Sequence, residues 1–496
     1  MSPRHGKRPG PLTRALDALN NQLDRIDKQR TTGPAQAEKP ERERPVKRKP
    51  DHASQRPLFR RHRTAGGMER WARPAERHGH MASTAHVQAL YPFQASSPLG
   101  NRGVLIGRSV YGGAFAIDPW QLYAEGVLQD ANLIILGLKG LGKSALLKCY
   151  ALRQRVFGRR IEVIDRKSEY EGVIAAMGGV TLRLRPGVRI NPLERQGSRS
   201  SRESLLRAVA RALLGRELTP VERVGLSAAL TAVDERILDR DVVIPDVTHE
   251  LREPSDGLTR ELSMGSEQTR EKLRECMLAL RDLEVGPLRG MFDGPTTHGS
   301  EVWSNPALAI DISHISEHTY GEDENVALAI ALISCTSFLD ARRREREARG
   351  DRSKVVRVND EAWRALAVPG AADYYNASLK LSRKTGVQYA LALHRLTDLS
   401  ATGDAGTRTQ TLAEGLVSEC ATRVVYRQAA QEADLTTRSL QLSSTERELL
   451  TQLGQGEALW RAGERGFLVR HLIAAAEWPL VQTDEGMAAR APQVVG

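Results

Sequence analysis

The sequence predicts an α/β fold with a mostly parallel central sheet. Short apolar runs of strand length recur along the chain, as at ANLIILG (131–137) and RIEVIDR (160–166). Segments with apolar residues at helical spacing separate these runs, which is what parallel crossover connections require. A glycine-rich loop at residues 137–144 also joins the first of these strands to a helix. Together, the three observations predict strands that form one sheet and helices that connect successive strands.

The chain length and composition narrow the class of protein. The 496 residues are enough for one large α/β domain with an insertion and a tail, or for two or three domains. The four cysteines contain no CxxC pair, which argues against a zinc site or a disulfide framework and suits a reducing cytosol. The longest apolar stretch (327–339) is too short to span a bilayer and predicts a buried helix. No apolar segment follows the basic start, so we expect no signal peptide, and any membrane role would come through a partner.

Positive charge is concentrated in residues 1–80, which contain 20 Lys and Arg against 9 Asp and Glu. The rest of the chain has 52 of each kind, so the net charge of +11 belongs to this segment. Residues 1–83 are rich in Pro, Gly and Arg and have too little apolar surface to offset the entropy of ordering, so we expect a disordered tail. Two interpretations stay open: an arm that contacts DNA or anionic lipid through phosphate neutralisation, or a solvated linker.

The changes of pattern along the chain predict six segments. They are a basic tail (1–83), a short β-rich lead-in (84–130), the first half of the core (131–192), a helical insertion (193–305), the second half of the core with a C-terminal hairpin (306–484) and a flexible end (485–496). The lead-in contains two expected strands around the turn SVYGG (109–113). After the insertion, apolar runs predict four more strands, at 307–313, 354–361, 387–394 and 422–428. The final hairpin is expected to turn near Glu464 and Arg465.

The loop GLKGLGKS (137–144) satisfies the pattern GxxxxGK[ST]. Its glycines allow backbone N–H groups to turn inward around the α- and β-phosphates, at the positive end of the following helix. Lys143 is expected to reach the β- and γ-phosphates, and the hydroxyl of Ser144 to coordinate Mg²⁺. With a strand before it and a helix after it, the loop predicts a site for ATP and Mg²⁺. The predicted nucleotide-binding residues are Gly137, Leu138, Lys139, Gly140, Leu141, Gly142, Lys143, Ser144 and Ala145.

A pair of acidic residues follows the apolar strand in KVVRVNDEAWRAL (354–366). At the end of a strand beside the phosphates, Asp360 would hold the Mg²⁺ shell and Glu361 would polarise the attacking water as general base. Most Asp-Glu pairs lie on the solvated surface without a catalytic role. Here, the position at the end of a strand favours a role in catalysis. Arg357 and Asn359 interrupt the apolar strand, and Asn359 either hydrogen-bonds the Mg²⁺ shell or is simply tolerated.

Three basic residues are further candidates for catalytic roles. His394 ends the strand VQYALALH, where a polar side chain can sense the γ-phosphate; a histidine satisfied by local backbone explains the position equally well. Arg383 stands near the end of a helix and Arg423 near the start of a strand, and either could act as an arginine finger on a neighbouring subunit's nucleotide. For Arg383, the alternative is a favourable interaction with the helix C-terminus.

In this order, the motifs resemble the ATPase domain of the conjugative-transfer or type IV secretion assembly ATPases. These are the VirB-type and TraC-type proteins of the HerA/FtsK superfamily of P-loop ATPases. The matching stretches run over residues 101 to 484 and include GVLIGRSVYGGAFAIDPW, GLKGLGKS, IEVIDRKSEYEGVIAAMGG, INPLE, LTPVER, MFDGPT, AIDIS, NDEAW and SRKTGVQYALALH. The combination of DxKSEYxG followed by GG, INPL and DEAW is the specific part of the resemblance.

The resemblance implies a RecA-like core with a helical insertion, which assembles as a ring, often a hexamer, with nucleotide at the subunit interfaces. It also implies a cytoplasmic protein at the inner face of the cell membrane that couples ATP hydrolysis to pilus biogenesis and substrate transfer, with channel components as partners. Asp165, Lys167 and Glu169 match the DxKSEY stretch, where an acid could tune Mg²⁺ or water or have a structural role. The sequence departs from the family in two ways. The N-terminal docking domain is not recognisable before Gly137, and His394 stands where the superfamily commonly has glutamine.

Three functions stay open at this level, of which we prefer the first. The first is a secretion or conjugation ATPase, and the second is a DNA-translocating motor or coupling protein of the same superfamily. The neutral charge balance of residues 81–496 disfavours the second, because a DNA pump usually needs a positive pore. The third is a nucleotide-dependent scaffold with weak turnover, which the irregular Asn359 and His394 allow.

Overall fold

The computed structural model describes residues 99, 103–319, 322–361, 363–396 and 415–482. All of them belong to the second of two compact units of the chain, residues 74–496. The expected basic tail (1–83) and flexible end (485–496) lie outside the described residues.

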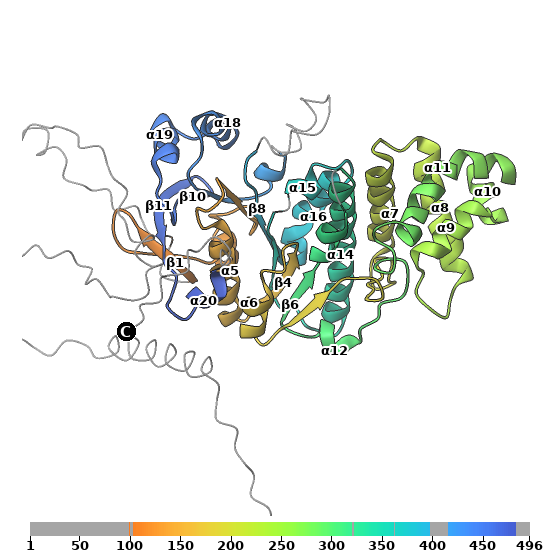
Figure 1. Ribbon diagram of the computed structural model, residues 1–496, viewed down its shortest axis with the longest axis horizontal. Helices are drawn as coiled ribbons and strands as arrows, with labels where there is room; N and C mark the ends of the chain where they lie inside the picture. The colour runs from red at the N-terminus through yellow and green to blue at the C-terminus, as the bar shows by residue number, and fades with distance from the viewer. Residues whose placement is uncertain (1–98, 100–102, 320–321, 362, 397–414, 483–496) are drawn as a thin grey trace, which may run out of the picture. The chain divides into compact units, whose positions relative to one another are not determined.

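One sheet of eleven strands organises the described residues (Figure 1). The strands are β1 (Val104–Ser109), β2 (Ala114–Ile117), β3 (Leu133–Leu136), β4 (Arg160–Asp165), β5 (Val180–Arg183), β6 (Ala307–Asp311), β7 (Val355–Asn359), β8 (Val387–Ala392), β9 (Thr422–Val425), β10 (Glu457–Ala462) and β11 (Arg465–His471). Their order across the sheet is β2-β1-β11-β10-β9-β3-β8-β7-β4-β6-β5. From β9 to β5, neighbouring strands are parallel, and β2, β1, β11 and β10 extend one edge in antiparallel pairs. The prediction of an α/β fold with a mostly parallel sheet is therefore confirmed.

Helices cover both faces of this sheet. The helices of the described residues are α4 (Pro119–Ala124), α5 (Lys143–Val156), α6 (Glu171–Ala176), α7 (Arg199–Leu214), α8 (Pro220–Arg236), α9 (Ile244–Arg252), α10 (Asp256–Leu262), α11 (Ser266–Val285), α12 (Ser300–Trp303), α13 (Ser313–His318), α14 (Glu322–Ala348), α15 (Trp363–Leu366), α16 (Ala371–Thr385), α18 (Ala430–Leu440), α19 (Ser444–Gln452) and α20 (Trp478–Val481), and not all of them contact the sheet. In Figure 1, α5 and α6 lie on one side of the central strands, and α14 and α16 lie on the other.

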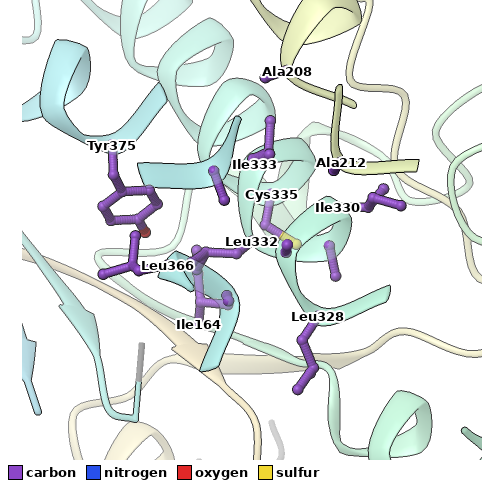
Figure 2. Packing of buried hydrophobic residues seen from close by; sticks show 14 of the residues in the cluster. Ile164, Ala208, Ala212, Leu328, Ile330, Leu332, Ile333, Cys335, Leu366 and Tyr375 are labelled. Atoms are coloured by element: carbon purple, nitrogen blue, oxygen red, sulfur yellow. The ribbon is translucent and has the colours of Figure 1, made fainter. Parts of the chain in front are cut away.

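The central strands are buried on both faces, because successive side chains of a strand point to opposite sides. Ile134 of β3 packs in the core that contains α14 and α7, whereas Ile135 packs in the core that contains α5. Figure 2 shows part of the first core, where Ile164 of β4, Leu332 of α14 and Ala208 of α7 come together. This alternation explains why the parallel strands are almost continuously apolar in sequence.

Helices α7 to α12 lie between β5 and β6 in the chain. Of these, α7 packs directly against α14 and α16, and α8, α9, α10 and α11 pack on one another and beside α7 (Figure 1). The start of α8 is defined by a capping box in which Thr219 and Glu222 exchange side-chain to backbone hydrogen bonds, with Pro220 at the first helical position. Local sequence signals therefore define where α8 begins.

Within the described residues, α14 is the one helix that is long and apolar enough to cross a membrane by length and composition alone. However, 78% of its most apolar window is buried inside the protein, and it packs against α7, α15 and α16. These are properties of a core helix, as the sequence predicted for residues 327–339.

Both hairpins expected from the sequence are present, and they extend the same sheet. β1 and β2 pair across the turn at 110–113, and β10 and β11 pair from Glu457–Arg470 to Ala462–Arg465. The second turn consists of Gly463 and Glu464, where the glycine has a φ angle of 60°. Through β10, this C-terminal hairpin lies next to β9 and therefore close to β3.

Candidate active site

The candidate active site forms where four neighbouring parallel strands, β3, β8, β7 and β4, end at the same edge of the sheet. Gly137, Asp360 and Arg166 directly follow β3, β7 and β4, and His394 lies two residues after the end of β8. Side chains that are far apart in the sequence therefore meet at one place. The carboxyl edge of a parallel sheet is the usual position of a ligand site in α/β proteins.

The loop from Gly137 to Gly142 connects β3 to the first residue of α5. Gly137 has a φ angle of 143°, and a Cβ atom there would lie 2.6 Å from the Cβ of Tyr426. Both the backbone conformation and the available space therefore require glycine at this position. The first N–H groups of α5 have no partner within the helix, so the loop and the helix together form a site suited to anions.

Lys143 is buried inside this loop. Its Nζ donates hydrogen bonds to the carbonyl oxygens of Gly137 and Leu138, at 2.6 and 2.8 Å. Burial lowers the pKa of Lys143 to about 8, although the charges of Asp360 and Glu361 act in the opposite direction. The ammonium group is therefore held beside the backbone groups that would surround a phosphate chain.

Asp360 faces α5 and contacts the loop. Its carboxylate accepts a hydrogen bond from the hydroxyl of Tyr170 at 3.3 Å, and the hydroxyl of Ser144 lies close enough to interact with it. Burial raises the pKa of Asp360, and the interaction with Ser144 lowers it. A serine hydroxyl beside a carboxylate is an oxygen donor set that suits Mg²⁺. The two residues predicted to hold the metal thus lie in direct contact, and the donor set fits the ion.

Glu361 has a φ angle of 60°, which is uncommon for any residue other than glycine. Its carboxylate pairs with Arg166 at 2.5 Å and with Lys167, and it lies 3.4 Å from Nε2 of His394. Burial by itself would raise the pKa of Glu361, but the contacts with His394 and Lys167 lower it to about 2. At neutral pH, Glu361 is therefore a charged carboxylate that three basic side chains hold on a strained backbone.

The loop that follows β4 positions several of these partners. Asp165 accepts hydrogen bonds from the backbone N–H groups of Lys167 and Tyr170, at 3.0 and 2.8 Å. Burial raises the pKa of Asp165 to about 6, against these two hydrogen bonds. Glu169 pairs with Lys148 of α5 at 3.2 Å. These contacts favour a structural role for Asp165 and Glu169, one of the two alternatives that the sequence left open.

Arg383 and Arg423 do not lie at the loop of their own chain. Because β3, β8 and β9 are parallel, the start of β9 and the end of the helix before β8 lie at the opposite edge of the sheet. Burial raises the pKa of Asp130, just before β3, to about 6, and the charge of Arg383 acts against that rise. Nε of Arg423 donates to the carbonyl oxygen of Cys420 at 3.1 Å. A role for either residue as an arginine finger would concern a neighbouring subunit and stays a prediction.

The two polar residues that interrupt β7 have partners on the α14 and α16 side of the sheet. Arg357 is fully buried, and its guanidinium contacts Glu162 at 2.7 Å and Asp340 at 2.9 Å. The amide nitrogen of Asn359 donates to the hydroxyl of Tyr375 on α16. Arg357 is therefore explained by partners in the core on that side, whereas Asn359 has one partner there and its Oδ1 is buried without a hydrogen bond.

Sequence reasoning missed a chain of hydrogen bonds beneath the loop. Nε1 of Trp460 donates to Nε2 of His471 at 2.8 Å, and Nδ1 of His471 lies 2.8 Å from the hydroxyl of Tyr426. Burial lowers the pKa of His471 to about 3, so the ring is neutral and its proton lies on Nδ1, which donates to Tyr426. The hydroxyl of Tyr426 in turn donates to the carbonyl oxygen of Gly142 at 3.2 Å. No local motif marks these residues, because strand order alone brings them together.

No family model and no curated protein sequence matches this chain. Solved structures do match its fold. VirB4 of Thermoanaerobacter pseudethanolicus superposes with a TM-score of 0.61 at 21% sequence identity, over 77% of this chain and 99% of that one. The chain has the fold of VirB4. The resemblance that the motifs indicated is therefore confirmed at the level of the fold.

Weaker matches include the plasmid coupling protein TrwB. Its complex with a non-hydrolysable ATP analogue has a TM-score of 0.48 and 16% identity, over 81% of this chain and 96% of that one. Its complex with ADP and Mg²⁺ also has a TM-score of 0.48 and 16% identity, over 75% of this chain and 91% of that one.

Proposed function

We propose that this protein is a P-loop ATPase that energises a conjugation or type IV secretion system, through channel or pilus assembly and substrate transfer. The observation that carries the proposal is the contact between Ser144 and Asp360, because it joins the loop to the acidic pair across the helical insertion. The VirB4 fold supports it. A buried lysine, a metal-binding hydroxyl and two carboxylates at one edge of a parallel sheet form the set of groups that hydrolysis of a nucleoside triphosphate requires.

In this proposal, the backbone N–H groups of residues 137–145 and the ammonium group of Lys143 bind the phosphate chain. Ser144 and Asp360 would hold Mg²⁺, which when bound neutralises charge on the β- and γ-phosphate oxygens. His394 lies at the end of β8 beside Glu361, so its imidazole is positioned to respond to the terminal phosphate. The role of His394 as a sensor remains part of the proposal.

Glu361 is the proposed general base for the attacking water. A carboxylate with a pKa of about 2 is a weak base at neutral pH. Removing the positive charges of Arg166 and Lys167 from its surroundings raises that pKa. We infer that phosphate oxygens draw these two cations away from Glu361 when nucleotide binds, which makes the carboxylate an effective base only in the loaded site.

The same proposal includes an assembly and a location. Subunits would form a ring, such as a hexamer, with nucleotide at the interfaces, where Arg383 or Arg423 would reach the site of the next subunit. Channel components of the inner membrane would be the partners, and the protein would lie at the cytoplasmic face of that membrane. Residues 1–80 would supply a contact with DNA or anionic lipid.

The test of the ATPase proposal is Glu361→Gln. We expect ATP affinity within about threefold of wild type and a loss of turnover of at least about 100-fold, because general base catalysis contributes about that much. Binding of a fluorescent ATP analogue and release of phosphate measure the two quantities. Glu464→Gln, in the exposed turn between β10 and β11, is the matched control and should change neither. Undiminished turnover in Glu361→Gln would rule out Glu361 as the base.

The basic segment 1–80 favours a second candidate, a DNA-translocating ATPase or coupling protein. Turnover that DNA stimulates, and that loses this stimulation when residues 1–80 are deleted, would support this candidate over the first. ATP binding with no turnover, with or without membrane partners, would instead support a nucleotide-dependent scaffold.

A further inference from the structure

A cleft lies between α7, α14 and α16, and none of the residues that line it belongs to the candidate active site. Its volume is about 290 Å³, just below the usual range for small-molecule sites, which suits a small ligand. Residues of all three helices line it, together with Tyr389 of β8. The lining is rich in arginine and serine, which is unusual for a cleft that only separates packed helices.

The arginines near the end of α14 differ in their partners. Three of them contact carboxylates: Arg342 with Glu194, Arg343 with Glu347 and Arg346 with Glu162. Arg344, which lines the cleft, instead donates from Nη2 to the hydroxyl of Ser201 at 2.8 Å, and no carboxylate of the described residues pairs with it. Its Nη1 is buried without a hydrogen-bond partner. A guanidinium N–H without an acceptor is costly, so a rotation of the Arg344 side chain that brings this group to an oxyanion in the cleft would be favourable.

A second incompletely paired cation faces the same cleft from α7. Arg207 has its one carboxylate contact within the described part of the chain at 3.9 Å, to Glu203, and its Nε is buried without a partner. The two carboxylates that line the cleft are already paired with arginines: Asp340 with Arg357 at 2.9 Å and Asp373 with Arg211 at 2.7 Å. The positive charge of Arg207 and Arg344 is therefore not balanced within the cleft.

Hydroxyl groups stand beside these arginines. Ser200, Ser201 and Ser204, in the first turns of the 16-residue helix α7, all line the cleft. The helix N-terminus adds partial positive charge at the same place. Two guanidinium groups with several hydroxyl donors offer more hydrogen bonds than the two oxygens of a carboxylate accept, whereas a phosphate group has three or more acceptor oxygens.

We propose that this cleft binds a small phosphate-bearing ligand, whose phosphate oxygens are held by Arg344 and Arg207 and by the serine hydroxyls of α7. The size of the cleft and its walls of three helices favour a free small molecule over a nucleic acid backbone. Inorganic pyrophosphate contains the same chemical group and is the probe for the test. The inference is independent of the proposed ATPase, because its readout is binding and not turnover.

The experiment is calorimetric titration of pyrophosphate, without Mg²⁺, into the full chain that carries Lys143→Ala. This background weakens phosphate binding at the loop, so that binding in the cleft is measured. We expect one site per chain, an affinity at least tenfold weaker when Arg344→Ala is added, and a smaller loss with Ser201→Ala. Arg349→Ala is the matched control, since Arg349 lies just beyond the same helix with 68% of its side chain exposed and pairs with Glu345. It should change the affinity by less than twofold.

Three outcomes would overturn the proposal. One is the absence of binding in the Lys143→Ala background, which would place all phosphate binding at the loop. Another is an equal effect of Arg344→Ala and Arg349→Ala, which would indicate a general effect of charge. The last is binding of a DNA duplex that depends on Arg344 while binding of pyrophosphate does not. Thermal unfolding of each variant identifies loss of the fold, and Ser201→Ala, which removes one hydroxyl, keeps the test valid if Arg344→Ala is unfolded.

Discussion

Two buried polar networks, one on each face of the sheet, differ in their chemistry. On the α14 face the network is ionic: Glu162 lies between Arg357 and Arg346, and Arg357 also contacts Asp340. On the α5 face, beneath the P-loop, the network is neutral and consists of Trp460, His471 and Tyr426. The ionic network is stable only when every charge has a partner, whereas the neutral network is stable only while His471 is uncharged. The two networks should therefore lose their contribution to stability under different conditions.

Glu361 lies at the carboxyl edge of the sheet, between the two faces. Its surroundings differ from those of both networks. Its carboxylate is ionic, like Glu162, but its backbone is strained and its partners Arg166 and Lys167 are partly exposed. Such a pairing can open at little cost, whereas the pairing of Glu162 cannot. The comparison therefore separates ion pairs that stabilise the fold from ion pairs that can rearrange during a reaction.

The largest expected effect is that of breaking the ionic network with Arg357→Ala. Burial alone would raise the pKa of Glu162, and the charge of Arg357 is the first of the contacts that lower it. Removing Arg357 leaves a buried carboxylate with Arg346 as its remaining cation, so we expect a loss of about 3 kcal/mol in the free energy of unfolding. Equilibrium denaturation in urea measures this loss.

Two further variants sharpen that result. Replacing the two most buried members, as Arg357→Met with Glu162→Leu, should recover part of the lost stability, because apolar residues of similar size need no partner. The recovery is partial, since Arg346 loses Glu162 and Asp340 loses Arg357. Arg447→Ala breaks an exposed pair with Asp434 and should leave the denaturation midpoint unchanged. If Arg357→Ala is as stable as Arg447→Ala, the ionic network does not stabilise the fold.

The network of Trp460, His471 and Tyr426 should contribute less to the stability of the fold at acidic pH. The pKa of His471 is about 3 in the folded chain and near its ordinary value of about 6.5 when unfolded, so between these values the unfolded chain binds a proton that the folded chain does not. The contribution to stability is complete above pH 6.5 and is lost as the pH falls. Between pH 7 and pH 4.5, we expect this histidine to remove about 2 to 3 kcal/mol from the free energy of unfolding.

The variant His471→Gln isolates this effect, because glutamine donates and accepts hydrogen bonds without titrating. Asp130 and Asp165, with pKa values raised to about 6, act in the opposite direction over part of this range, but they are common to both proteins and cancel in the difference. His249→Gln, at an exposed position, is the control and should keep the acid sensitivity of the wild type. Equal pH dependence in His471→Gln and wild type would contradict a neutral buried His471.

The sequence predicted the parts of the site that are local in the chain. The loop around Lys143 and the pair Asp360–Glu361 were found because each follows an apolar strand, and strand ends of parallel sheets share an edge. Arg357 was noticed as an irregularity, but its partner Glu162 lies on a neighbouring strand, which no local pattern specifies. The roles of the site residues remain predictions, since geometry shows contact and not catalysis.

The network of Trp460, His471 and Tyr426 could not be predicted in the same way. It exists because β10 and β11 add to the sheet beside β9, which places the C-terminal hairpin under the loop. Sequence alone predicted the hairpin but not its neighbour, because the pairing of distant strands depends on long-range packing.

The smallest expected effect concerns the strained backbone that distinguishes Glu361 from Glu162. Glu361→Gly and Glu361→Ala both remove the carboxylate and its ion pairs, so they differ chiefly in the cost of a φ angle of 60°. Because glycine adopts this conformation freely, Glu361→Gly should be more stable than Glu361→Ala by about 1 kcal/mol. At Glu464, which has no positive φ angle, the same pair of substitutions should show the opposite order. Equal stabilities of the two Glu361 variants would mean that the site holds its base without backbone strain, and that the ion pairs with Arg166 and Lys167 alone position it.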